Sequence, residues 1–240
     1  MSGHSKWSKI KRQKGANDAK RGASFTRHGN AIAVAAKQGG ADPDLNPSLA
    51  LAIEKAKADN MPNDNIDRSI KRGTGELGGG VIEEITYEGY GPAGVAILID
   101  CATDNRNRTY SDVRTAFSKN GGNMAETGAV GYLFDRKGVI AATKTDDPDS
   151  DQLVAIDAGA EDIVDDDDSW TIYVEAKTLH STAAELKKNG LTVTSADLAF
   201  VPKVTMVIED EKQQAKIIRL MDVLDELDDV VDTHTNFDIA

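Results

Sequence analysis

The sequence predicts a mixed α/β protein with three domains: an N-terminal three-helix domain, a discontinuous α/β middle domain and an inserted ferredoxin-like βαββαβ domain. Three observations carry this prediction. Residues 17–73 place apolar side chains at helical spacing. The glycine-rich stretch GTGELGGG at 73–80 is typical of a linker. Residues 136–202 show strand and helix patterns in the order βαββαβ, which is typical of the ferredoxin-like fold.

The N-terminal part divides into an arm and a helical domain. Residues 1–16 lack an apolar period and are rich in small and cationic side chains, so we expect a flexible basic arm. Residues 17–75 form the predicted helical domain. Its first helix starts at Asn17 or Asp18, its second has Asn46 as cap and Pro47 in the first turn, and its third covers 63–73.

The middle domain is predicted to be discontinuous, comprising residues 76–135 and 203–240. The first part offers strands VIEEITYEG and AGVAILIDCAT, a helix over 106–122 with a capping pair at Thr109 and Asp112, and a strand AVGYLF. The second part offers a strand VTMVI, an amphipathic helix over 210–229 and a closing strand VVDTHTNFDI. Each part is an incomplete α/β unit, and together they make one sheet with two helices. Residues 136–202 are then an inserted domain.

Charge is divided unequally along the chain. The whole protein carries a formal charge of −12, yet residues 1–75 hold 14 Lys/Arg against 7 Asp/Glu, and residues 76–240 hold 14 against 33. Such asymmetry predicts one end that meets a polyanion and a body that repels it. The nucleic-acid-binding candidates in this end are Lys6, Trp7, Lys9, Lys11, Arg12, Lys14, Lys20, Arg21 and Arg27. Cations neutralise phosphates, and an indole stacks on bases.

A second cationic cluster, DNRNRT at 104–109, contains the further candidates Arg106 and Arg108. They lie where a predicted strand passes into a helix, and free N–H groups at a helix start can hold an anion. The alternative is an exposed loop with ordinary capping by Asn105, Asn107 or Thr109.

Catalytic and cofactor motifs do not emerge from the sequence. Two G-x-G-x-x-G matches, at 73–78 and 89–94, lack the strand-before-helix context of dinucleotide binding. The acids at 147, 149, 151 and 165–168 fit solvated turns better than a metal site. Cys101 lies in an apolar strand pattern and is expected to be core. We therefore expect no enzyme, no cofactor and no metal.

The sequence also predicts the cellular compartment of the protein. Runs such as VAILI at 95–99 are too short to span a membrane, and no apolar stretch follows the basic start. A single cysteine fits a reducing compartment. The expectation is the cytoplasm, or the mitochondrial matrix if the source is eukaryotic.

Several segments resemble the YebC/PmpR family: GHSKW at 3–7, DAKRG at 18–22, NMPNDNIDRSIKRGTG at 60–75, YEGYGPAGVAILIDCATDNRNRT at 87–109, FSKNGGN at 117–123 and AGAEDI at 158–163. The resemblance implies a three-domain α/β protein with a non-enzymatic role in gene expression. Members are classed as DNA-binding transcriptional regulators, and others, including a mitochondrial translational activator of cytochrome oxidase, act in translation. It also implies nucleic-acid contacts among the basic residues of 3–27. Ala23 stands where relatives often carry Lys, and Gln13 and Gly15 also depart from common family choices.

Three functions stay open at this point. The first is a DNA-binding transcriptional regulator that contacts phosphates through the basic arm and helical domain, with a ribosome-associated RNA-binding translation factor as its alternative. Duplex DNA and ribosomal RNA cannot be separated as targets. The second is an enzyme with an anion-binding cleft between domains. The third is an adaptor whose acidic face binds a basic partner.

Overall fold

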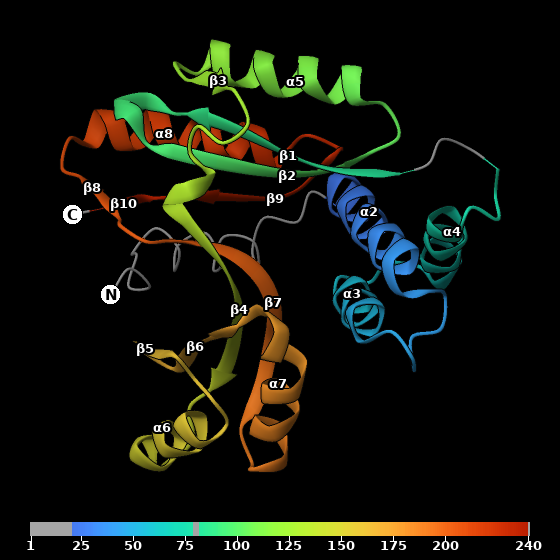
Figure 1. The fold of residues 1–240 in the computed structure, drawn as a ribbon, viewed down its shortest axis with the longest axis vertical. Coiled ribbons are helices and arrows are strands. Elements are labelled where there is room, and N and C mark those ends of the chain that lie inside the picture. The colour runs from blue at the N-terminus through green and yellow to red at the C-terminus, as the bar shows by residue number, and fades with distance from the viewer. Residues whose placement is uncertain (1–20, 79–81, 240) are drawn as a thin grey trace.

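The computed structural model describes residues 21–78 and 82–239, and it confirms the predicted three-domain α/β architecture (Figure 1). The arm predicted at 1–16 lies outside the described residues. A sheet covered by α5 and α8 occupies one end of the long axis, the inserted domain occupies the other, and the helical domain lies beside them. The domain limits at 75/76, 135/136 and 202/203 stay predictions.

The N-terminal domain consists of three helices, α2 (Arg21–Gly39), α3 (Pro47–Ala58) and α4 (Asn63–Thr74). Asn46 caps α3 as predicted, because its side-chain oxygen accepts the Leu49 N–H at 3.1 Å. The same side chain donates to the Ala35 carbonyl at 2.8 Å and so joins the start of α3 to the end of α2. α2 and α4 pack so closely at Gly73 that a Cβ atom there would overlap the Ala33 carbonyl oxygen, so the contact requires glycine.

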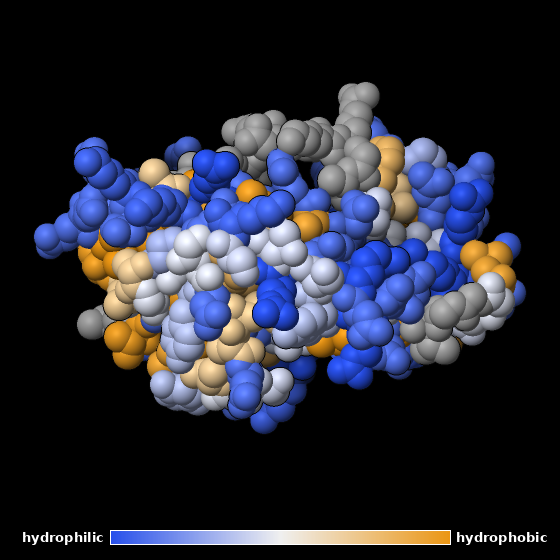
Figure 2. Space-filling model, turned by 90° about the horizontal axis from the view of Figure 1, so that it is seen from above, coloured by the Kyte–Doolittle hydropathy of each residue, from blue (hydrophilic) through white to orange (hydrophobic). Residues whose placement is uncertain are grey.

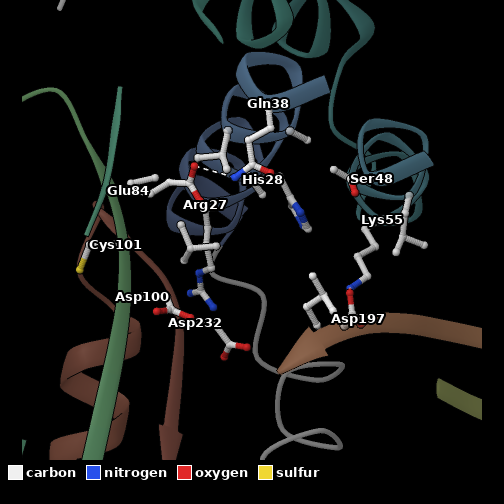
Figure 3. A pocket seen from close by; sticks show the side chains of 18 of the residues that line it. Arg27, His28, Gln38, Ser48, Lys55, Glu84, Asp100, Cys101, Asp197 and Asp232 are labelled. Atoms are coloured by element: carbon white, nitrogen blue, oxygen red, sulfur yellow. Dashed lines mark hydrogen bonds and ion pairs between the residues drawn. The ribbon is translucent and has the colours of Figure 1, made fainter. Parts of the chain in front are cut away.

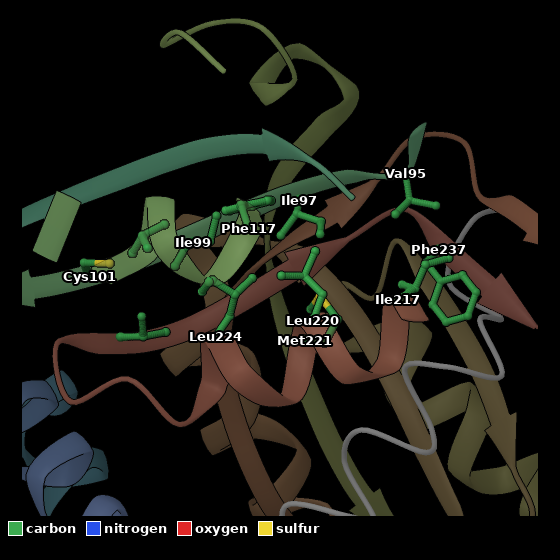
Figure 4. Close-up of a cluster of buried hydrophobic side chains, with 13 residues drawn as sticks. Val95, Ile97, Ile99, Cys101, Phe117, Ile217, Leu220, Met221, Leu224 and Phe237 are labelled. Atoms are coloured by element: carbon green, nitrogen blue, oxygen red, sulfur yellow. The ribbon is translucent and has the colours of Figure 1, made fainter. Parts of the chain in front are cut away.

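The middle domain is built on an antiparallel sheet in the order β3-β1-β2-β9. Its elements are β1 (Glu83–Tyr90), the 3-10 helix η1 (Pro92–Gly94), β2 (Ala96–Thr103), α5 (Arg106–Lys119), β3 (Asn123–Ala125), α8 (Glu211–Asp225) and β9 (Val230–Thr235). The alternate β2 residues Ile97, Ile99 and Cys101 pack against Phe117 of α5 and Leu220 of α8 (Figure 4). Segments from both sides of the insertion therefore share one core. The surface seen from the side of α5 is mostly hydrophilic (Figure 2).

The strand predicted for AVGYLF is wrong. Gly131–Leu133 form a 3-10 helix, η2, and of that stretch only Phe134 enters a strand, β4. The cause is Glu88 on β1, whose buried carboxylate accepts the N–H groups of Gly128 at 2.6 Å, Val130 at 2.7 Å and Gly131 at 2.8 Å. A backbone that turns three N–H groups toward one carboxylate cannot also lie in a ladder.

Two further expectations need correction. VVDTHTNFDI is not one strand: it breaks at Asn236 into β9 and β10 (Phe237–Ile239), and β10 pairs in parallel with β8 (Met206–Ile208). The Asn236 side chain accepts the Ala96 N–H at 2.8 Å, which fixes the break. Helix α5 is capped by Asn105 rather than by the pair Thr109 and Asp112, because the Asn105 side chain accepts the Arg108 N–H at 3.2 Å.

The inserted domain has the ferredoxin-like strand order β5-β6-β4-β7, with every neighbour antiparallel. Its elements are β4 (Phe134–Thr143), α6 (Pro148–Asp157), β5 (Asp162–Asp166), β6 (Ser169–Glu175), the 3-10 helix η3 (Ala176–Thr178), α7 (Leu179–Lys188) and β7 (Thr192–Pro202). Asp147 caps α6. Asp151 was expected in a solvated turn, yet it is buried and accepts the Trp170 Nε1–H at 2.9 Å and the Thr145 N–H at 2.8 Å.

Candidate nucleic-acid interface

Most residues predicted to bind nucleic acid precede the described part of the chain. Lys6, Trp7, Lys9, Lys11, Arg12, Lys14 and Lys20 lie outside the described residues, and Arg21 is the first residue of α2. The structure describes the side chains of Arg27, Arg106 and Arg108. It does not bring the three together, since each contacts a different partner.

Arg27 lies at the junction between the helical and middle domains. Its guanidinium donates to the Asp225 carbonyl at 2.8 Å, where α8 ends. One turn further along α2, Asn30 donates to the Asp228 carbonyl at 2.9 Å and accepts from Arg72 of α4 at 2.5 Å. Burial lowers the pKa of the Arg72 guanidinium from its ordinary value, although the negative charges of Asp104 and Asp229 act to raise it. Helix α2 is thus fastened to the turn between α8 and β9, mainly through main-chain carbonyls.

Arg108 is held by carboxylates of the middle domain. It contacts Asp229 at 2.8 Å and Asp104 at 3.1 Å, and the hydrogen bond to Asp229 raises the pKa of Arg108. The Asp229 carboxylate also accepts the hydroxyls of Thr109 at 2.7 Å and Thr103 at 3.1 Å. The strand-to-helix junction therefore carries a capped helix and an internal ion pair, which is the ordinary-capping alternative for DNRNRT.

Arg106 differs from its neighbour. Its side chain is 67% exposed, and its Nε lies 3.7 Å from a Glu83 carboxylate oxygen. A contact at that distance between exposed groups holds the side chain weakly. Arg106 is therefore the described candidate that is most accessible to a phosphate.

The positive excess of the N-terminal part lies before the described side chains. Residues 1–24 hold seven Lys/Arg and one acid, whereas residues 25–75 hold seven Lys/Arg and six acids. Sequence reasoning missed two exposed cations in this second group, Arg68 and Lys71, which lie three residues apart on α4. The sequence pattern that indicates them is NIDRSIKRG, because Ile66 and Ile70 face inward at helical spacing and the cations between them then face outward.

Residues of all three domains line a cleft of about 550 Å³ (Figure 3). Its charged residues are nearly balanced: three Lys or Arg (Arg27, Lys55, Arg136) against four acids (Glu84, Asp100, Asp197, Asp232). Lys55 of α3 forms an ion pair with Asp197 of β7 across the cleft. Arg106 and Arg108 are not among the lining residues. This balance gives the cleft little attraction for an anion.

Three described groups that could carry enzyme chemistry, His28, Cys101 and His234, are either buried or already paired with a carboxylate, and the first two of them line the cleft. Burial raises the pKa of Cys101 to about 12, so its thiol is protonated at neutral pH. His28 pairs with Asp59 at 2.6 Å, and His234 contacts Asp100 at 3.2 Å. Among the described residues, no group of three or more His, Cys, Asp or Glu side chains could hold a metal ion. In that same part of the chain, no helix is both long enough and apolar enough to cross a membrane.

Comparisons with known proteins test the predicted resemblance. The model of the TACO1/YebC protein N-terminal domain matches residues 5–76, and that of the TACO1/YebC second and third domain matches residues 82–237. Proteins from Herpetosiphon aurantiacus and Desulfotalea psychrophila, each named "Probable transcriptional regulatory protein", are 48% and 50% identical over all of this chain and 96% of their own length.

A solved structure agrees with the sequence relatives. The crystal structure of a conserved hypothetical protein from Aquifex aeolicus matches with a TM-score of 0.84 and 43% identity, over 93% of this chain and 92% of that one. Because the two family models together span nearly the whole sequence, the resemblance stated from the motifs is confirmed, and the chain belongs to the TACO1/YebC family.

Proposed function

We propose that the protein is a non-enzymatic regulator of gene expression that binds nucleic acid through its N-terminal basic residues. The observation that carries the proposal is the charge division: seven Lys/Arg and one acid in residues 1–24, on a protein of net charge −12. A polyanion is attracted to that segment and repelled by the acidic remainder. The names of the relatives, "Probable transcriptional regulatory protein", support a regulatory role.

The structure supports a division of labour among the candidate cations. Arg27 and Arg108 serve domain packing, through the Asp225 carbonyl and the Asp229 carboxylate. The proposed phosphate contacts are therefore the basic residues between 6 and 21, with Arg106 as an accessible addition. Arg68 and Lys71 of α4 extend the exposed cations on the helical domain.

Duplex DNA is the first target we propose, in line with the names of the relatives, and structured RNA on the ribosome is the alternative. One observation makes the alternative as plausible as duplex DNA. A helix-turn-helix reader inserts its second helix into the major groove. Here α3 faces the cleft instead, with Leu51 and Ala52 among the lining residues and Lys55 paired to the inserted domain. Backbone contact without base readout suits structured RNA as well as DNA.

The test pairs two binding assays on the intact chain over a salt series: gel shift with duplex promoter DNA and co-sedimentation with ribosomes. If about five phosphates are neutralised, log K falls with log salt at a slope of about −4.5. The variant reverses four charges, with Lys9, Lys11, Arg12 and Lys14 changed to Glu. Its matched control reverses four exposed lysines of the acidic domains, Lys187, Lys188, Lys212 and Lys216.

The expected result is that the arm reversal abolishes binding in whichever assay detects it, while the control keeps most of it. The assay that responds identifies DNA or ribosomal RNA as the target. Undiminished binding of the arm variant in the responding assay contradicts the assignment of the arm. No binding of the unaltered chain to either target at low ionic strength contradicts the function itself.

A further inference from the structure

Helix α6 of the inserted domain presents an apolar ridge to solvent. Leu153 and Ile156 are 63% and 58% exposed, and they lie three residues apart, so they share one face of the helix. The opposite face is fixed to the domain, because Ala155 is buried in its core and Asp151 accepts the Trp170 indole N–H. The ridge is therefore the outward side of a helix whose inward side packs on the domain.

Carboxylates border the ridge. Asp149 and Asp157 lie four residues before and after Leu153, hence on the same side of the helix, and both are exposed. The surrounding stretch, residues 144–168, contains eleven acids, of which Asp151 is buried, and a single base, Lys144. That lysine is already engaged, since it pairs with Asp165 and lies 4.7 Å from the centroid of the Trp170 ring. The result is an apolar centre with an acidic rim.

The chemistry of this surface selects its partner. Nucleic acid and anionic lipid are repelled by the carboxylates, and a second copy of the same surface would place like charges together. A cationic amphipathic helix satisfies both parts at once, with aliphatic side chains against the ridge and lysines or arginines against the rim. The area is small, so the contact suits a transient rather than a permanent complex.

We propose that the outer face of α6, centred on Leu153 and Ile156, is a docking surface for a basic amphipathic segment of another protein. The helix lies at the end of the molecule opposite α5 (Figure 1). The inference is independent of the proposed function, since it depends on the inserted domain alone.

The test measures fluorescence anisotropy with the intact chain and labelled 14-residue peptides. The probe consists of leucines and lysines with the leucines on one helical face. One comparison peptide has the same composition in scrambled order, and another has glutamates in place of the lysines. The variant is Leu153→Asn with Ile156→Asn. The matched control, Val204→Asn with Val207→Asn, removes two other exposed apolar side chains, which are 71% and 54% exposed.

The expected result is that the amphipathic cationic peptide binds, and that the Leu153/Ile156 variant weakens binding at least tenfold, or about 1.4 kcal/mol. The control pair stays within twofold, and all chains keep the same thermal unfolding midpoint. The surface assignment is overturned if the peptide does not bind, if the scrambled or acidic peptide binds equally, or if both variants lose equally. A tenfold gain on deleting residues 2–16 would instead identify the chain's own arm as the occupant.

Discussion

Glu88 offers the sharpest test of how the middle domain is held together. It is only 7% exposed, and its two carboxylate oxygens accept three backbone N–H groups from the loop that leads into β4. Burial alone would raise the pKa of Glu88, but the hydrogen bonds from the N–H groups of Gly128, Val130 and Gly131 outweigh it and hold the pKa below its ordinary 4.5. The charged form is therefore the one that the fold stabilises.

The perturbation is Glu88→Gln, which keeps the shape and removes the charge. One oxygen accepts from Gly128 and the other from both Val130 and Gly131. A Gln amide has only one acceptor oxygen, so its NH₂ group must face at least one of these N–H donors. A buried donor left without its acceptor costs about 1–3 kcal/mol, and bonds to a charged acceptor are the stronger kind. We expect a loss of about 2–3 kcal/mol in the free energy of unfolding at pH 7.

The assay is urea unfolding followed by circular dichroism from pH 7 to pH 3, with Glu126→Gln as control. Glu126 is exposed in the same loop, so the same charge change there should cost no more than about 0.5 kcal/mol. Because the folded-state pKa of Glu88 is depressed, its stabilisation is complete above pH 4.5 and declines as the pH falls through the folded pKa. The gap between wild type and Glu88→Gln must then narrow in acid. A gap that is constant from pH 7 to pH 3, or no larger than that of the control, refutes the reasoning.

Three other measurements follow from the same structure. Asp229→Asn should lower the free energy of unfolding by about 2 kcal/mol, because Arg108 loses its opposite charge and the donors that share the two carboxylate oxygens are left with one acceptor oxygen. Asp228→Asn, at an exposed neighbour, should change it little, and equal effects would contradict the network. Gly73→Ala should destabilise the protein by about 1–3 kcal/mol in thermal unfolding, because the new Cβ overlaps the α2 backbone. Helix propensity alone favours Ala at this position, so a stabilised variant would refute the close approach of α2 and α4. Cys101 should resist a thiol reagent at pH 8 in the native protein and react on unfolding, so rapid native labelling would argue against its burial.

The features predicted correctly from sequence depend on neighbours in the chain. Asn46 next to Pro47 predicts the start of α3, because a cap acts within three residues of itself. The βαββαβ order predicts the strand order of the inserted domain, since the connections leave few other arrangements. The conformation of AVGYLF was missed because Glu88, some forty residues earlier, decides it.

The candidate site shows the same limit. Arg108 looks like a phosphate ligand in the sequence, yet its partner Asp229 lies 121 residues away in the chain. The role of Arg27 depends on the Asp225 carbonyl, 198 residues away, and no side-chain pattern announces a main-chain acceptor. Charge counts revealed which end of the protein is cationic, but they could not separate the cations that pack domains from those that stay accessible.

The packing contacts of α2 and the proposed phosphate contacts should respond differently to salt. Arg27 and Asn30 fasten α2 through the carbonyls of Asp225 and Asp228, which are neutral acceptors, so dissolved salt should weaken these bonds little. The phosphate contacts that we propose for the basic residues before α2 should instead weaken steeply with salt. The two kinds of contact meet in one helix, because that segment enters α2 at Arg21. Under the proposed function, release of a nucleic acid by salt should therefore leave α2 attached to the middle domain.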